Sequence, residues 1–135
     1  MNPQDIGGQI DIQVAAFQKG YGGGAFSGPA LDLIPDAEQQ YESVSFFAFT
    51  RNGSAGDVVD LHLEESTDDG SNWSDEGTEL TNLNDASDNQ KDDYDAEVAA
   101  GNIRVAGDSG DQTVGASVDL IVVAVLGGAH QMPTS

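Results

Sequence analysis

Few side chains in this sequence have the types and spacing that enzyme chemistry requires. The two histidines are His62, in an alternating apolar and polar run, and His130, near the end of the chain. No nucleophile elbow, phosphate-binding loop, dinucleotide fingerprint or HExxH zinc motif occurs. Carboxylate pairs are frequent, but 24 acidic residues in 135 produce close pairs by chance, so they are weak evidence for acid–base catalysis. We therefore expect a protein that is not an enzyme.

Carboxylate oxygens are also the ligands that Ca²⁺ and Mg²⁺ prefer. No acidic cluster has the spacing of an EF-hand loop, because alignment on Gly70 places the first and third ligand positions on Glu65 and Thr67. The chain has no cysteine, so zinc would have only histidines and carboxylates as ligands. We expect no cofactor, and a single Ca²⁺ or Mg²⁺ ion is the alternative that the sequence leaves open.

Residues 58–75 predict two strands around one tight turn. Val59, Leu61 and Leu63 alternate with polar residues, which is the period of a strand with one buried face. The turn combines short side-chain oxygens that can accept from backbone N–H groups, a glycine that can take positive φ, and a tryptophan after the bend. These turn residues are Ser66, Asp68, Gly70 and Trp73.

The same spacing, S-x-D-x-G-x-N-W, resembles the Asp-box hairpin of sialidase-type propellers. Those proteins repeat the motif once per blade, whereas this chain has one copy and too few residues for a propeller. The motif therefore predicts a hairpin and no glycosidase activity.

Length and composition predict a single all-β domain. A chain of 135 residues has the size of one domain that can bury a core. Seventeen glycines, short β-branched runs and no long helical period favour an antiparallel sandwich of the jelly-roll or Ig-like kind. We expect a flexible arm over residues 1–8, one β-sandwich domain over 9–126 and a loose tail over 127–135.

Several further strands are predicted by alternation or by apolar runs. They cover residues 10–17, 31–33, 41–50, 102–106 and 114–126. In 41–50 one face, with Val44, Phe46 and Ala48, can fill the core. The other face, with Phe47 and Phe49, needs cover from a loop or another chain, so these two rings are possible subunit contacts. In 102–106 a lone arginine, Arg104, is expected to be ion-paired and not to bind a ligand.

Two stretches lack a strand pattern. Residues 19–29 contain five glycines and a proline. They predict either a flexible connector or a contact loop in which Tyr21 and Phe26 lie against a neighbouring subunit. Residues 84–95 are polar and acidic and predict a long exposed loop.

The charge balance indicates a salt-rich environment. The formal net charge is −20, with only Lys19, Lys91, Arg51 and Arg104 as cations. So much like charge weakens a compact state in dilute buffer, whereas molar salt shortens the Debye length to about 3 Å and screens the repulsion. We expect a protein of an extreme halophile or its virus. Four scattered cations make no basic patch, so nucleic-acid binding is not expected.

No membrane or export segment is expected. The N-terminus lacks the basic and apolar regions of a signal peptide. The longest apolar run, residues 120–126, is far shorter than the roughly 20 residues that span a bilayer.

Four segments in order resemble a family of small proteins encoded beside major capsid proteins in tailed viruses, here of the haloarchaeal kind. They are YESVSF after a Leu-Asp-Leu segment, a hydrophobic strand leading into ESTDDGSNWSD, NIRV after a glycine, and VGASVDLIVVAVLG with a proline near the end. Ile103 departs from the aromatic residue common in the family, and the acidic stretch before it is unusual. The resemblance implies a head decoration or accessory virion protein on a jelly-roll or Ig-like sandwich.

The expected function is a structural virion protein of a halophilic tailed virus. It would be made in the host cytoplasm, form a homo-oligomer, and decorate or cement the capsid surface in contact with the major capsid protein. One alternative is a carbohydrate- or receptor-binding module of a spike or tail fibre, in which Trp73, Tyr21, Tyr41 and Tyr94 would stack on sugar rings. Trp73 is expected in the core, which disfavours this alternative. The other alternative is a tail-tube or connector protein.

Overall fold

The computed structural model describes residues 9–34, 39–41, 43–84, 90–97 and 101–131. Apart from one 3₁₀ turn at Ser109–Asp111, the regular elements in these ranges are strands. The strands are β1 (Gln9–Tyr21), β2 (Phe26–Ser27), β3 (Leu31–Asp32), β4 (Gln39–Gln40), β5 (Ser43–Arg51), β6 (Val58–Ser66), β7 (Ser74–Asn84), β8 (Gln90–Glu97), β9 (Asn102–Gly107) and β10 (Val118–Gln131).

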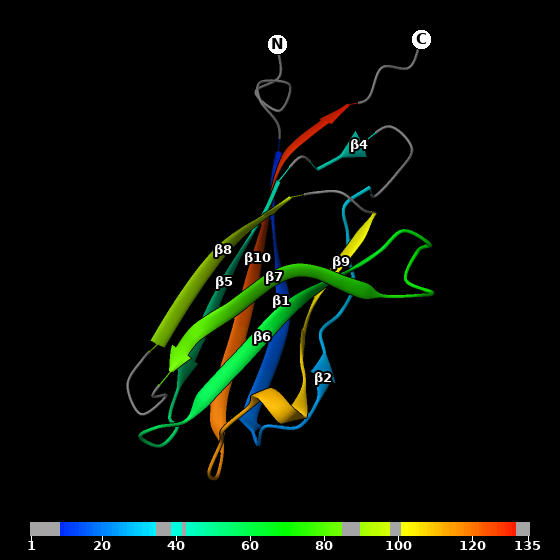
Figure 1. Cartoon of the computed structure of the whole chain (residues 1–135). Coiled ribbons are helices and arrows are strands. Elements are labelled where there is room, and N and C mark those ends of the chain that lie inside the picture. Colours follow the sequence, from blue (N-terminus) through cyan, green and yellow to red (C-terminus); the bar gives the residue numbers. More distant parts are fainter. Residues whose placement is uncertain (1–8, 35–38, 42, 85–89, 98–100, 132–135) are drawn as a thin grey trace.

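The strands form two antiparallel sheets that pack as a sandwich (Figure 1). The first sheet has the order β1-β10-β5-β8, with β4 paired to β10. The second sheet has the order β2-β9-β6-β7, with β3 paired to β9. The predicted all-β sandwich is therefore confirmed.

The core lies between the two sheets and follows the predicted alternation. On β5 the inward residues Val44, Phe46 and Ala48 are fully buried. On β6 the alternate residues from Val59 to Leu63 are also fully buried. Strand β10, the neighbour of β5 in the same sheet, buries alternate residues as well. These buried side chains of β6 and β10 are Val59, Leu61, Leu63, Val118, Leu120, Val122, Ala124 and Leu126.

The predicted hairpin joins β6 to β7, and Asp68 organises its turn. Its carboxylate accepts a hydrogen bond from Ser66 Oγ at 2.7 Å and from the Asn72 backbone N–H at 2.9 Å. Gly70 has φ of +85°, which a residue without Cβ adopts at little cost. The hydrogen bonds from Asn72 and Ser66 lower the pKa of Asp68 to about 2. The turn is thus built by side-chain to backbone bonds, as its sequence predicts.

Three boundary predictions are wrong. Strand β10 continues to Gln131, so residues 127–131 are not a loose tail, because β4 and β1 pair with that part of β10. Strand β8 occupies residues 90–95, the second half of the predicted 84–95 loop, because its backbone pairs with β5. Residues 85–89 of that prediction lie outside the described residues. The loop predicted from residue 19 begins later, since β1 runs to Tyr21. The predicted 1–8 arm and residues 132–135 lie outside the described residues.

Tyr21 is a core residue, contrary to its predicted place in a contact loop. Its side chain is buried, its hydroxyl donates to the Gly24 carbonyl at 2.6 Å, and its ring meets Phe26 edge-on at 5.3 Å. Burial raises the pKa of this hydroxyl. The loop therefore connects the first sheet to the second, and Tyr21 offers no surface to a neighbour.

Candidate functional site: an exposed apolar sheet face

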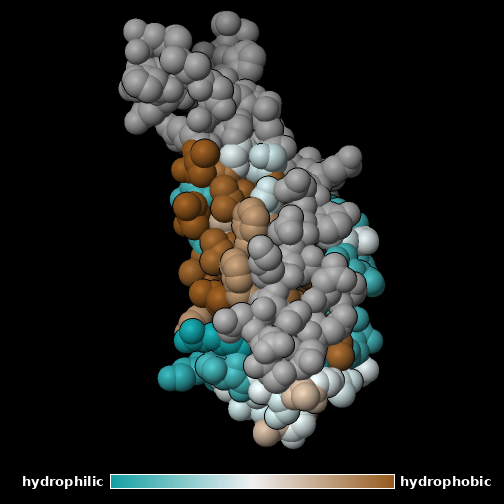
Figure 2. Space-filling model, turned by 90° about the vertical axis from the view of Figure 1, so that its left-hand side faces the viewer, coloured by the Kyte–Doolittle hydropathy of each residue, from teal (hydrophilic) through white to brown (hydrophobic). Residues whose placement is uncertain are grey.

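The outer face of the first sheet is apolar and exposed to solvent. Its residues stand in three rows across β1, β10 and β5, which we call the apolar face. The rows are Ile12, Val125 and Ser45, then Val14, Val123 and Phe47, then Phe17, Ile121 and Phe49, with Ile10 at the end of β1. Figure 2 shows hydrophobic residues in a column along this side of the sandwich.

The exposure is large for apolar side chains. Ile10 is 72% exposed, Ile12 66% and Phe17 65%, while Val14, Phe47 and Phe49 are between 37% and 51% exposed. Scattered apolar residues are normal on a protein surface, but a contiguous patch marks a site of association. The apolar face is therefore the strongest candidate for a functional surface among the described residues.

A β-bulge in β1 keeps this face continuous. The register with β10 shifts between Val14 and Ala16, so that Ala15 and Ala16 both point inward and are buried. The outer face therefore carries residues 10, 12 and 14 from before the bulge and Phe17 from after it. The backbone at Gly28 lies directly against the Ala15 carbonyl, where a Cβ would clash with the oxygen.

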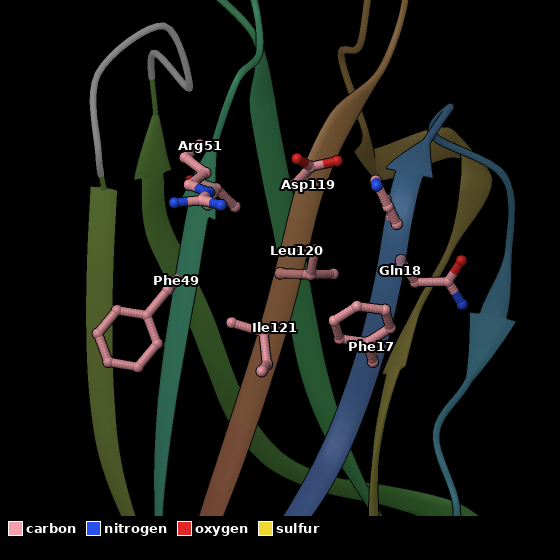
Figure 3. Close-up of a pocket in the computed structure, with 9 residues that line it drawn as sticks. Phe17, Gln18, Phe49, Arg51, Asp119, Leu120 and Ile121 are labelled. Carbon is pink, nitrogen blue, oxygen red and sulfur yellow. The ribbon is translucent and has the colours of Figure 1, made fainter.

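A shallow pocket of about 610 Å³ lies at one end of the apolar face. Phe17 and Phe49 stand on either side of Ile121, which lies at its base (Figure 3). Beyond the rings the lining becomes charged, with Lys19 from β1, Arg51 from β5 and Asp119 from β10. The pocket therefore has an aromatic part, between Phe17 and Phe49, and a charged part with two cations and Asp119.

Asp119 is held between the two cations by neutral donors. Its carboxylate accepts from Asn52 Nδ2 at 2.8 Å and from the Gly20 backbone N–H at 3.0 Å. These two hydrogen bonds lower the pKa of Asp119, and the charges of Lys19 and Arg51 add to the effect. The three side chains together carry a charge of about +1, in a chain whose net charge is −20.

The outer face of the second sheet is polar by contrast. Glu64 accepts from Arg104 Nη2 at 2.7 Å and from Nε at 2.8 Å, and its second oxygen lies 3.1 Å from His62 Nε2. Burial alone would raise the pKa of Glu64, but the hydrogen bonds with His62 and Arg104 outweigh it and lower the pKa. The prediction that Arg104 is paired is confirmed.

Trp73 is not a core residue, which corrects the prediction. It is half-buried beside the second sheet, its Nε1 donates to the Gly70 carbonyl at 3.1 Å, and the Arg104 guanidinium lies 4.2 Å from the ring centre. One ring face is covered by a cation, which is an attractive arrangement in proteins. Trp73 therefore packs against Arg104, the cation that is ion-paired with Glu64.

Of the predicted subunit contacts, Phe47 and Phe49 lie on the apolar face, Phe26 is half-buried against Tyr21, and Tyr21 is internal. The β1 residues that dominate the face, and the cations at its end, were not among the predicted site residues. The signal that could have found them lies in three predicted strands. Residues 10–17 have one apolar side, and the strands at 41–50 and 114–126 are apolar on both sides. Within the described ranges, no three histidines or acids gather as metal ligands, and no helix is long and apolar enough to cross a membrane.

The fold and the site define a class: a small acidic antiparallel β-sandwich with one exposed apolar sheet face. The sequence matches no protein-family model and no curated protein. The crystal structure of the PBSX exported protein XepA is similar in fold, with a TM-score of 0.55 and 16% identity over 93% of this chain. A structure of infectious bursal disease virus, Gx strain, gives a TM-score of 0.40 and 10% identity over 94% of this chain. This chain spans 39% and 37% of those two chains, and the likeness to XepA shows the sandwich fold alone.

Proposed function

We propose that this protein is a structural component of the virion of a halophilic tailed virus. In this role it decorates or cements the capsid surface, in contact with the major capsid protein and with its own copies, after synthesis in the host cytoplasm. The observation that supports the proposal is the exposed apolar face, because a stable sandwich has no need of such a surface unless another protein covers it. The family resemblance of residues 31–133 points to the same role.

The apolar face has enough uncovered surface to hold a partner. The exposed fractions of its six most exposed side chains add up to about 3.3 whole side chains. At about 1.5–3 kcal/mol for each buried side chain, covering them would contribute roughly 5–10 kcal/mol. Association costs about 4–15 kcal/mol in lost translational and rotational freedom. Because this cost is about as large as the gain from burial, only a partner that covers the whole face binds stably. Such a threshold suits a face that is covered only by a protein surface that matches its whole area.

The acidic composition fits a particle that stays soluble in brine. Like charges at this density keep particles apart, while high salt screens the repulsion inside each subunit. The polar outer face of the second sheet, with Asp60, His62 and Glu64, would then lie toward solvent. The carbohydrate-binding alternative receives no support from Trp73, because Arg104 covers one face of its ring.

The test is the location of the protein in virus particles. Particles from the producing cells are purified on a density gradient in molar salt, and the protein is detected with an antibody. We expect wild type to co-sediment with the major capsid protein, together with Ile34→Asn, which replaces a 41% exposed residue outside the face. The double variant Ile12→Asn/Val14→Asn should fold and remain in the soluble fraction.

Wild type left at the top of the gradient would overturn the proposal. Incorporation of the double variant as well as wild type would show that the apolar face does not hold the protein in the particle. A protein found only in separated tails or tubes would move the assignment to the tail-tube or connector alternative.

A further inference from the structure

The first sheet has most of its cations at one end, where Asp119 also lies, and acidic positions at the other end. Lys19 and Arg51 line the pocket at one end, and the register of β8 places Lys91 opposite Phe49 at the same end. Three of the four cations of the chain are therefore at one end of one sheet. At the other end, the register places Asp95 opposite Ser45 and Glu97 opposite Ser43.

The dimensions of the sheet match those of a dimer interface. The stretch from Ile10 to Phe17 is about 26 Å long, and four strands are about 19 Å wide, which gives a projected area of about 500 Å². Upright side chains make the accessible area larger than this projection, so it is comparable to the ~800 Å² that each partner buries in a standard interface. An apolar centre with charges at its rim is also the usual anatomy of an interface.

We propose that the apolar face is covered by a second copy of this chain, packed face to face about a two-fold axis that runs across the strands. This deepens the proposed function and rests on it. In this arrangement each copy lays its cationic end, with Lys19 and Arg51, over the acidic end of its partner. A two-fold axis along the strands would instead bring the two cationic ends together, so the charge distribution selects the first orientation.

The same arrangement fixes which residues meet. The central row of the face, Val14, Val123 and Phe47, lies over its own copy at the axis. The aromatic row, Phe17 and Phe49, lies over the partner's row of Ile12 and Val125. The register also places Asp93 opposite Phe47, so the axis brings this acidic position near its own copy. Association of two chains of charge −20 should therefore strengthen as salt rises.

The first test is sedimentation equilibrium of the purified full chain over a range of concentrations and salt. We expect a monomer–dimer equilibrium in molar salt. Phe17→Ser/Phe49→Ser removes side chains that are 65% and 42% exposed, and should weaken the dimer at least about 100-fold without loss of fold. The matched control Ile34→Ser, also an exposed apolar residue, should leave the dimer within about twofold of wild type.

The second pair of variants tests the cations. Lys19→Gln/Arg51→Gln should weaken the dimer about tenfold in moderate salt, an effect that molar salt abolishes. Thr67→Asp/Ser71→Asp makes the same change in net charge at exposed positions of the hairpin turn, and should weaken it less than about threefold. Equal effects of the two double variants would show that only net charge matters, and would overturn the proposed role of the cationic end.

Cross-linking tests the orientation, because the chain has no cysteine of its own. Val14→Cys should be joined to its own copy by a short bis-maleimide, whereas Thr67→Cys in the hairpin turn should not. If Val14→Cys fails to cross-link but a mixture of Val14→Cys and Phe47→Cys chains does, the axis runs along the strands and the orientation is wrong. A monomer at every concentration and salt, combined with wild type in the particle fraction, would overturn the second copy as occupant and leave the virion role intact.

Discussion

Replacing Arg104 with methionine should destabilise the sandwich by about 2–4 kcal/mol at neutral pH. The guanidinium makes two contacts of 2.7 and 2.8 Å with Glu64 Oε1, and each side chain is only about one fifth exposed. Hydrogen bonds to charged groups contribute about 1.5–3 kcal/mol, and the pair lies between exposed pairs of about 0–1 kcal/mol and buried pairs whose disruption costs about 3–5 kcal/mol. The stacking on Trp73 adds roughly 0.5–2 kcal/mol.

The assay is equilibrium urea unfolding followed by circular dichroism, since the fluorescence of Trp73 would respond to the substitution itself. A double-mutant cycle with Glu64→Gln should give a coupling energy of about 1 kcal/mol or more, because the two residues are in direct contact. The slope of the unfolding transition should not change, which would show that stability and not compactness is affected. A loss below about 0.5 kcal/mol, or a coupling near zero, would refute this account of the pair.

The pH dependence supplies an independent check on the same pair. The folded pKa of Glu64 is lowered below its ordinary value of 4.5, with hydrogen bonds from His62 and Arg104 outweighing the effect of burial. A carboxyl with a depressed pKa contributes stability that is present above about pH 4.5 and is lost as pH falls through the lower folded pKa. Arg104→Met should therefore flatten the acid limb of the stability curve, and an unchanged acid limb would contradict the assignment.

Three further predictions concern single positions. Gly28→Ala should lower stability by about 1–3 kcal/mol or more, because the Cβ of the alanine would meet the Ala15 carbonyl. An unchanged melting temperature in thermal unfolding would contradict that close approach. Asp60→Asn should raise stability by at most about 0.5 kcal/mol at neutral pH and low salt, because burial and Glu79 raise the pKa of Asp60 while solvent screens a carboxylate this exposed. The advantage should disappear in acid, where Asp60 is protonated. Wild type should lose stability between about pH 4 and pH 2 as Asp68 is protonated, and Asp68→Asn should lack that part of the loss in an acid titration.

Much of the core was predictable from the alternation of apolar residues. In β5 and β6 a period of two assigns each side chain to one face, and the inward sets of both strands are the buried ones. The hairpin turn was predictable because Ser66, Asp68 and Gly70 act locally through their own side chains and backbone. These features depend on residues close in sequence, where local chemistry decides the structure.

The orientation of β1 was not predictable by the same reasoning. Alternation shows that Ile10, Ile12 and Val14 share a face, but it does not say whether that face is inside. The answer depends on which strand β1 pairs with, and on a bulge at two alanines that the pattern does not mark. Because the dominant part of the apolar face lies on this strand, the site was only partly visible in the sequence.

Strand β8 was missed for a different reason. Its sequence, QKDDYDAE, lacks the apolar alternation that marks a half-buried strand. Its place in the sheet comes from eight register pairs with β5, which are backbone interactions open to any residue except proline. A polar edge strand of this kind is identified by its neighbour and not by its own composition.

The position of β10 in the first sheet has a consequence for biosynthesis. This strand, at the C-terminal end of the described chain, lies between β1 and β5, so β1 has no partner in the sheet while the ribosome is still translating the residues before 118. Strands that pair across such a long separation form late, after the loop-closure entropy has been overcome. The apolar rows therefore exist as a surface only once residues 118–131 have emerged and folded. A nascent chain that lacks β10 therefore has no complete apolar face through which to dock.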